Sequence, residues 1–278
     1  MMHGLHGSSY NWIINLPHQS PGFMFADAGF DVWLGNCRGN MYGQRHRTLN
    51  PFSHAFWDFT WEDMADQDIP AIVDHILNIR AVFGVAPVWT NAYSWGPAVV
   101  VSYKRPIYEI MYNLFGARQY HAKSATVIST IAKYICRFPF ADRACGLFLE
   151  SFGGMPTGQL NFTRTSVYMA STPAGSSTKN CIHWAQICHR NSNLRYDYGE
   201  KKNRERYGQS TPPSFNISRV STPNYLYWSL EDWLADDEDI NINLLPFLAD
   251  GVVQEAKIIP GFNHFDFIFG TDAAEKIY

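Results

Sequence analysis

The feature that most limits the possible folds is an alternation of strand-like and helix-like segments at both ends of the sequence. Near the start, Phe30–Gly35 is typical of a strand, and apolar residues spaced three or four apart predict a helix from Thr60 to about Ile79. Near the end, Tyr225–Trp228 and Gln254–Ile259 are predicted strands. Such alternation favours a mainly parallel sheet covered by helices, so we expect the α/β class.

The predicted helices carry recognisable boundary signals. Thr60 and Asp63 can cap the long helix, and Pro70 inside it removes a backbone donor and should kink it. Shorter helices are predicted through Phe23, Phe25 and Ala26, over about 241–248, and from Asp272 onward.

The alternation stops in the middle of the chain. Residues 104–215 gain polar loops, and the strand and helix pattern returns only after them. We therefore predict a core built from residues 1–103 and 216–278, with residues 104–215 inserted as a cap.

Charge and hydropathy exclude several classes of protein. Lys plus Arg number 22 and Asp plus Glu number 25, which gives a net charge of −3 and argues against a general nucleic-acid binder. No apolar stretch approaches the roughly 18 residues of a membrane-spanning helix. No secretory signal is legible at the start of the sequence. We expect a soluble or peripheral protein without a transmembrane segment.

Two predicted loops carry an acid and a base in a suggestive order. Asp232 follows one predicted strand and His264 follows the next, 32 residues later. This order matches the second half of the Ser, Asp, His order of α/β-hydrolases, in which the carboxylate orients the imidazole as a general base. Taken alone, Asp232 is better explained as surface charge and His264 as a packed histidine, and it is their pairing and order that favour a function.

A third loop lies at the start of the chain. Residues 3–9, His-Gly-Leu-His-Gly-Ser-Ser, place a glycine beside an apolar residue. Such a turn can direct a backbone N–H into a cleft, as an oxyanion hole requires. An ordinary N-terminal tail explains the motif equally well.

Motifs along nearly the whole chain resemble those of the acid lipase family, which includes gastric lipase and lysosomal acid lipase. The matching segments are Gly7–Trp12, Ala26–Asn36, Arg38–Asn40, Phe56–Met64, Pro173–Ser177, Asp232–Asp236 and Asn263–Phe267. The resemblance implies an α/β-hydrolase with a helical cap.

The resemblance also implies an activity and its residues. It implies hydrolysis of triacylglycerols or sterol esters at a lipid–water interface, in a secreted or lysosomal setting and without a cofactor. It makes Asp232 the triad acid and His264 the triad base, and it assigns half of the oxyanion hole to the N–H of Leu5.

The resemblance further implies a disulfide between Cys136 and Cys145 in the cap, although two reduced thiols remain the alternative in a reducing compartment. Asn161 and Asn216 begin glycosylation sequons, which matter only in a secreted chain. The cysteine spacing gives no zinc motif, so no metal is expected.

The sequence departs from the family at the nucleophile. The family's Gly-His-Ser-Gln-Gly is absent, and the nearest substitute places Ser94 between Ala92 and Gly96. The β-branched residues in Pro97–Val101 favour a strand where a helix should follow the nucleophile. We therefore expect about one strand-turn-helix unit of roughly 30 residues to be missing, and the start of the chain to be truncated.

These observations leave three hypotheses. The leading one is a lipid ester hydrolase in which Ser94 attacks, His264 and Asp232 activate it, and the N–H groups of Leu5 and Trp95 hold the oxyanion. The alternative is a catalytically dead lipase-like scaffold or fragment that binds lipid or a partner. A third possibility is a chain too incomplete to fold stably.

Overall fold

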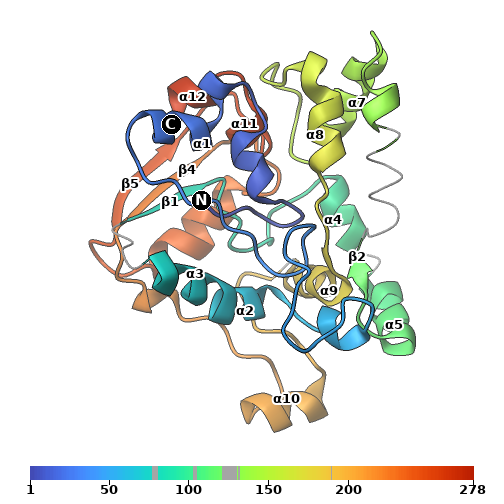
Figure 1. Cartoon of the computed structure of the whole chain (residues 1–278). Helices are drawn as coiled ribbons and strands as arrows, with labels where there is room; N and C mark the ends of the chain where they lie inside the picture. Colours follow the sequence, from blue (N-terminus) through green and yellow to red (C-terminus); the bar gives the residue numbers. More distant parts are fainter. Residues whose placement is uncertain (77–80, 103–104, 121–129, 131, 189) are drawn as a thin grey trace.

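Three parallel strands form the larger sheet of the molecule, which lies toward the left in Figure 1. The structure is a computed structural model, which describes every residue except 77–80, 103–104, 121–129, 131 and 189. The strands β1 (Val82–Val85), β4 (Asn224–Trp228) and β5 (Val253–Ile258) lie in the order β1-β4-β5. Both neighbouring pairs are parallel, which confirms the α/β class and the two predicted C-terminal strands.

Short helices surround this sheet. In the first part of the chain they are α1 (Pro21–Asp27), α2 (Trp61–Asp63), α3 (Ile69–Ile76) and α4 (Pro97–Ser102). The middle part contains α5 (Arg105–Phe115), α7 (Ala141–Glu150), α8 (Thr165–Ser171), α9 (Thr178–Ile187) and α10 (Glu200–Tyr207). The last two are α11 (Asp266–Phe269) and α12 (Ala273–Lys276).

The main core lies against strand β4. Along this strand, buried and half-buried residues alternate, so Leu226 and Trp228 point to one face. They pack with Ile240, Phe262 and Phe267 from the segments that follow β4 and β5. Burying these side chains fixes the positions at which both strands end.

The predicted helix over 60–79 is present but divided. Thr60 and Asp63 form the expected capping box, with the Thr60 N–H donating to Asp63 Oδ2 at 2.8 Å. A π-helical turn over Met64–Asp68 separates α2 from α3. Pro70 therefore follows a local widening of the helix, a common way to accommodate a residue that lacks an N–H. The end of the prediction, beyond Ile76, lies partly outside the described residues.

The predicted strand Phe30–Gly35 is wrong. This segment belongs to no assigned strand, and Phe30 and Trp33 are exposed. Its backbone hydrogen bonds reach Met1, through the Gly35 N–H to the Met1 carbonyl and the Met1 amino group to the Trp33 carbonyl, and the preceding helix, through the Phe30 N–H to the Phe25 carbonyl. A strand requires a row of hydrogen bonds to a neighbouring strand, and the local sequence does not show whether such a neighbour exists.

The predicted strand after Ser94 is also wrong, because Pro97–Ser102 forms α4. Gly96 has a φ of +91° and its carbonyl accepts the N–H groups of Val99 and Val100. Proline in the first helical turn has no N–H to leave unpaired. These start signals outweigh the preference of valine for strands.

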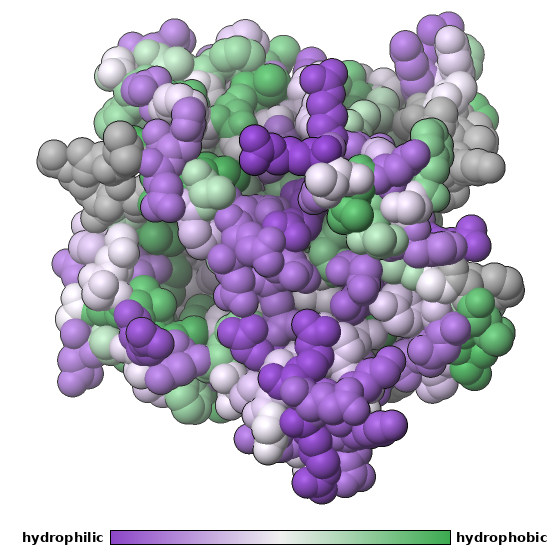
Figure 2. All heavy atoms as spheres, turned by 60° about the horizontal axis from the view of Figure 1, so that its bottom comes forward, coloured by the Kyte–Doolittle hydropathy of each residue, from purple (hydrophilic) through white to green (hydrophobic). Residues whose placement is uncertain are grey.

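A two-stranded antiparallel sheet and several helices make up residues 105–207. Strands β2 (Gln119–Tyr120) and β3 (Ser176–Ser177) pair beside α9, which also contacts α4 and α5. In Figure 1, α7 and α8 lie at the top and α10 at the bottom of this part. Figure 2 shows this lower side, where hydrophilic residues gather in the centre. Whether 104–215 is a separate cap stays a prediction.

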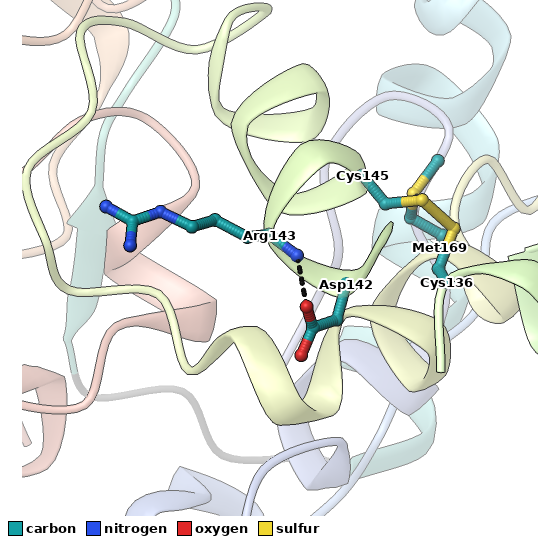
Figure 3. Close-up of a disulfide and its surroundings, with 5 residues drawn as sticks. All are labelled: Cys136, Asp142, Arg143, Cys145 and Met169. Carbon is teal, nitrogen blue, oxygen red and sulfur yellow. Dashed lines mark hydrogen bonds between the residues drawn. A yellow bond between two sulfur atoms is a disulfide. The ribbon is translucent and has the colours of Figure 1, made fainter. Parts of the chain in front are cut away.

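A disulfide joins Cys136 to Cys145 on α7 (Figure 3). The Met169 sulfur on α8 lies 4.0 Å from the Cys136 sulfur, so the bridge sits where α7 meets α8. None of the described helices is both long and apolar enough to cross a membrane.

Candidate active site

Asp232 and His264 meet in a direct hydrogen bond. His264 Nδ1 lies 2.9 Å from Asp232 Oδ2, and the Asp232 side chain is fully buried. The other carboxylate oxygen accepts the N–H groups of Leu234 and Ala235, both at 2.8 Å. A carboxylate fixed by two backbone donors holds the imidazole in one orientation.

The ends of two adjacent strands place these residues. Asp232 lies four residues after β4, and His264 lies six residues after β5. The carbonyl of Gly153 accepts both the Trp233 N–H at 3.0 Å and the His264 N–H at 3.3 Å. One backbone oxygen from the turn after α7 therefore joins the acid loop to the base loop.

The bond between the two side chains sets the tautomer of His264. An ionised carboxylate only accepts, so Nδ1 carries the proton and Nε2 is left as an acceptor. Burial lowers the pKa of His264, but the negative charge of Asp232 and the hydrogen bond to it raise the pKa, and the net shift is upward. The imidazole is thus prepared to take a second proton.

A cavity of about 2000 Å³ opens beside this pair. Its walls are mostly apolar and include Leu5, Phe148 and Phe152, and both Ser94 and His264 border it. The N–H of Leu5 donates to no group among the described residues. The structure thus brings three of the predicted site residues, Leu5, Ser94 and His264, to the same space.

The Ser94 side chain is oriented toward the backbone of the acid loop. Its hydroxyl is buried and donates to the Leu234 carbonyl at 2.9 Å, with Asn91 Oδ1 3.4 Å away. Within the described residues no hydrogen bond joins it to His264. No assigned strand leads into Ser94, and its φ is not positive, so the strained strand-to-helix turn of a hydrolase nucleophile is not formed here.

Trp95 does not fit the predicted oxyanion role in this arrangement. Its backbone N–H donates to the Trp233 carbonyl at 3.1 Å. Its ring packs on the Trp233 ring with centroids 4.4 Å apart. An N–H that already serves a loop contact cannot stabilise an oxyanion without breaking that contact.

A second buried carboxylate, Asp239, fixes the segment before Ser94. It accepts the Thr90 hydroxyl, the Ala92 N–H at 3.1 Å and the Tyr93 N–H at 3.0 Å. An amide group of Asn243 also donates to it at 3.0 Å. All of these donors are structural, so Asp239 holds a loop and orients no catalytic group.

One thiol also lines the cavity beside an imidazole. Cys181 Sγ on α9 lies 3.8 Å from His6 Nε2. Burial raises the pKa of this thiol to about 12, so it stays protonated and unreactive near neutral pH. No cluster of three or more potential metal ligands exists among the described residues.

Comparison with known proteins gives relatives along the whole chain. The chain is 35% identical to lipase lipl-1 of Caenorhabditis elegans, with all of this chain and 77% of that protein aligned. It is 33% identical to human lipase member K, again over its whole length and 76% of the relative. It is 32% identical to lysosomal acid lipase/cholesteryl ester hydrolase of Rattus norvegicus, over 99% of this chain and 76% of that protein.

The chain belongs to the acid lipase family. No family model matches it. A solved α/β hydrolase fold protein from Nakamurella multipartita aligns with 74% of this chain and 63% of its own, at 13% identity and a TM-score of 0.29. The alignment with lipl-1 runs over 314 positions, 36 more than the 278 residues of this family member.

The sequence analysis missed three positions that build the site in this family member. Asp239 follows several other acidic residues after β4, and nothing in the sequence sets it apart from them. Gly153 and Gly154 form a glycine pair after a helical segment, a signal for close backbone approach that was readable. A Cβ on Gly153 would lie 2.7 Å from the Phe265 ring, and one on Gly154 would lie 2.3 Å from the Glu231 carbonyl oxygen.

Proposed function

We propose that this protein hydrolyses lipid esters, with His264 as general base and Asp232 as the residue that orients it. The observation that carries the proposal is the bond between His264 Nδ1 and the buried Asp232 carboxylate at the edge of a large apolar cavity. Membership of the acid lipase family supports the same reaction.

In the proposed mechanism Ser94 is the nucleophile. Its hydroxyl leaves the Leu234 carbonyl and turns toward Nε2 of His264, which takes the proton as Oγ attacks the ester carbonyl. Asp232 stabilises the imidazolium that forms. The N–H of Leu5 stabilises the negative charge on the carbonyl oxygen.

The substrate in this proposal is a triacylglycerol or a sterol ester presented at a lipid–water interface. A cavity of about 2000 Å³ with walls such as Phe148 and Phe152 has room for long acyl chains. One relative is named a cholesteryl ester hydrolase, which supports the same substrate class.

Ester turnover by Ser94→Ala tests the mechanism. We expect loss of a triad serine to lower turnover of p-nitrophenyl esters on the order of a millionfold. The matched control is Ser192→Ala, which changes an exposed serine. Turnover by Ser94→Ala equal to that of the unaltered protein would exclude Ser94 as the nucleophile.

The second candidate function is lipid binding without hydrolysis. It is favoured by the engagement of the Ser94 hydroxyl and the Trp95 N–H in contacts with the acid loop. A fluorophosphonate probe separates the two proposals, since it labels an activated serine. Covalent labelling contradicts the binding-only function, whereas saturable binding of a fluorescent fatty acid without labelling supports it.

We also propose a secreted or lysosomal location. The disulfide between Cys136 and Cys145 fits an oxidising compartment. Asn161 is half-buried and Asn216 exposed, and in both sequons the hydroxyl of the third residue donates to the asparagine Oδ1. Treatment of the protein from its native cells with peptide-N-glycosidase should lower its mass, and an unchanged mass would argue against glycosylation.

A further inference from the structure

Two acidic side chains are buried beneath the loops that carry Asp232 and His264. Glu150, the last residue of α7, has no exposed surface. Among the described residues its carboxylate makes no well-formed hydrogen bond, although the backbone N–H of Thr157 interacts with it. Asp266, the first residue of α11, is equally buried. Its Oδ2 accepts the Thr157 hydroxyl at 2.6 Å and the Asn263 N–H at 2.7 Å, while its Oδ1 has no described partner.

The backbone next to Glu150 supports the acid and base loops directly. Its carbonyl accepts the N–H groups of Gly153 at 2.8 Å and Gly154 at 3.0 Å. The Gly153 carbonyl in turn accepts from Trp233 and His264, and Gly154 forms an isolated antiparallel bridge with Asp232. Any movement of Glu150 is therefore passed within one turn to both members of the acid–base pair.

Among the described residues, no positive charge is paired with these two carboxyl groups. On the packed elements, the guanidinium of Arg164 donates to a backbone carbonyl, that of Arg143 lies over an aromatic ring, and the ammonium of Lys276 pairs with a surface aspartate. His264 is bonded to Asp232. Two unneutralised carboxylates in such a site are costly, and the cost is removed by binding a proton.

The pKa values of both carboxyl groups are raised, as expected for buried carboxyl groups without a positive partner. Burial, reinforced by the charge of Asp266, raises the pKa of Glu150 to about 7, although the backbone N–H of Thr157 lowers it. Burial also raises the pKa of Asp266 to about 6, where the bonds from Thr157 and Asn263 lower it and the charge of Asp232 raises it. The folded protein thus binds protons that the unfolded chain, with ordinary carboxyl groups, has already released.

We propose that Glu150 and Asp266 are positioning residues that bind protons in the folded protein, and that this protonation keeps the Gly153 turn in place beneath His264. The inference rests on the acid–base role proposed for Asp232 and His264. Its tests measure the stability of the fold and the hydrogen bond of His264, not ester turnover. Failure of this inference can therefore be told apart from failure of the hydrolase proposal.

The sign of the pH effect follows from linkage. Because the folded state binds more protons between the ordinary and the raised pKa of Glu150, its stability falls as the pH rises from about 4.5 to about 7. We expect the ratio of folded to unfolded protein in urea to fall by roughly 10- to 100-fold between pH 5 and pH 7. A ratio that is constant or rises over this interval in the unaltered protein overturns the proposal.

The variant Glu150→Gln assigns the effect to this site, because an amide of the same shape never ionises. We expect it to remove most of the pH dependence and to be more stable than the unaltered protein at pH 7.5. The matched control Glu205→Gln, at an exposed position on α10, should keep the full dependence. An unchanged pH dependence in Glu150→Gln overturns the proposal.

A second measurement separates positioning from stability alone. The NMR signal of the His264 Nδ1 proton reports the bond to Asp232. We expect it to broaden above pH 7 in the unaltered protein and to stay sharp in Glu150→Gln, under conditions where both are folded. Equal broadening in the two proteins would mean that the pair does not position His264.

Discussion

Two buried aspartates on the segment after β4 differ in what their carboxylates hold. Asp232 uses one oxygen for two backbone N–H groups and the other for His264 at the cavity. Asp239 lies seven residues later. Its two carboxylate oxygens accept hydrogen bonds from the loop before Ser94 and from the Asn243 amide. Similar burial thus gives one aspartate a hydrogen bond to a histidine at the cavity and makes the other a structural anchor. The acid–base pair that follows β4 and β5 is in direct contact, whereas the Ser94 hydroxyl is bonded to the backbone of the acid loop.

Removing His264, the proposed base, should have the largest effect and tests whether the contact made by Asp232 is functional. We expect His264→Ala to lower ester turnover by 10⁴-fold or more, because the variant lacks the imidazole proposed to accept the proton. Steady-state turnover of a short-chain ester measures the effect. His18→Ala, at an exposed histidine, serves as the control. A rate within threefold of the unaltered protein would remove His264 from the reaction.

The next largest effect should come from neutralising the acid. We expect Asp232→Asn to lower turnover by about 10⁴-fold, since the imidazole loses the partner that fixes its tautomer. The pKa of His264 should also fall, because the charge of Asp232 is what raises it. A histidine whose pKa is raised in the folded state stabilises the fold at low pH, and this stabilisation is lost as the pH rises through the raised pKa. We expect the stabilisation to be absent from Asp232→Asn. An NMR titration that shows an unchanged pKa would contradict the assignment.

The opposite outcome is expected at Asp239. We expect Asp239→Ala to lower the free energy of unfolding by about 3 kcal/mol, because several buried donors lose their acceptor. Urea unfolding measures this loss, with Asp250→Ala at an exposed site as the control. The bond between Asp232 and His264 should survive in the folded fraction. A stable Asp239→Ala protein would show that the loop before Ser94 is held by other contacts.

The smallest predicted effect concerns the Gly153 turn, which joins the loops that carry Asp232 and His264. A Cβ on Gly153 would lie 2.7 Å from the Phe265 ring and 3.0 Å from the His264 Cβ, so Gly153→Ala must displace one of them. We expect a loss of about 1–2 kcal/mol in stability and a measurable drop in turnover. A thermal melt and the same ester assay record both. No change in either would mean that the turn tolerates a shift without moving His264.

The sequence predicted those parts of the molecule whose signals are local. Thr60 and Asp63 announce a helix start within four residues, and the strands β4 and β5 carry enough apolar pattern to be recognised. The order of Asp232 and His264 predicted that they would lie on neighbouring loops. For the acid–base pair, spacing and strand order were sufficient.

The misplaced parts depended on partners that the local sequence does not reveal. Phe30–Gly35 has strand-like residues but no neighbouring ladder, and the valines after Gly96 became helical because of how the helix begins. Nothing in the local sequence indicated that Glu150 is buried, and the residue argued to act with it, Asp266, lies more than a hundred residues away.

The order β1-β4-β5 leaves β1 and β5 as the two margins of the described sheet. Glu255 and Lys257 place charges along β5, and such charges discourage pairing with a strand from another molecule. Strand β1 is apolar, with Phe83 exposed, and its residues border the large cavity. Self-association of the purified protein should therefore begin at β1, and a detergent or fatty acid that occupies the cavity should suppress it.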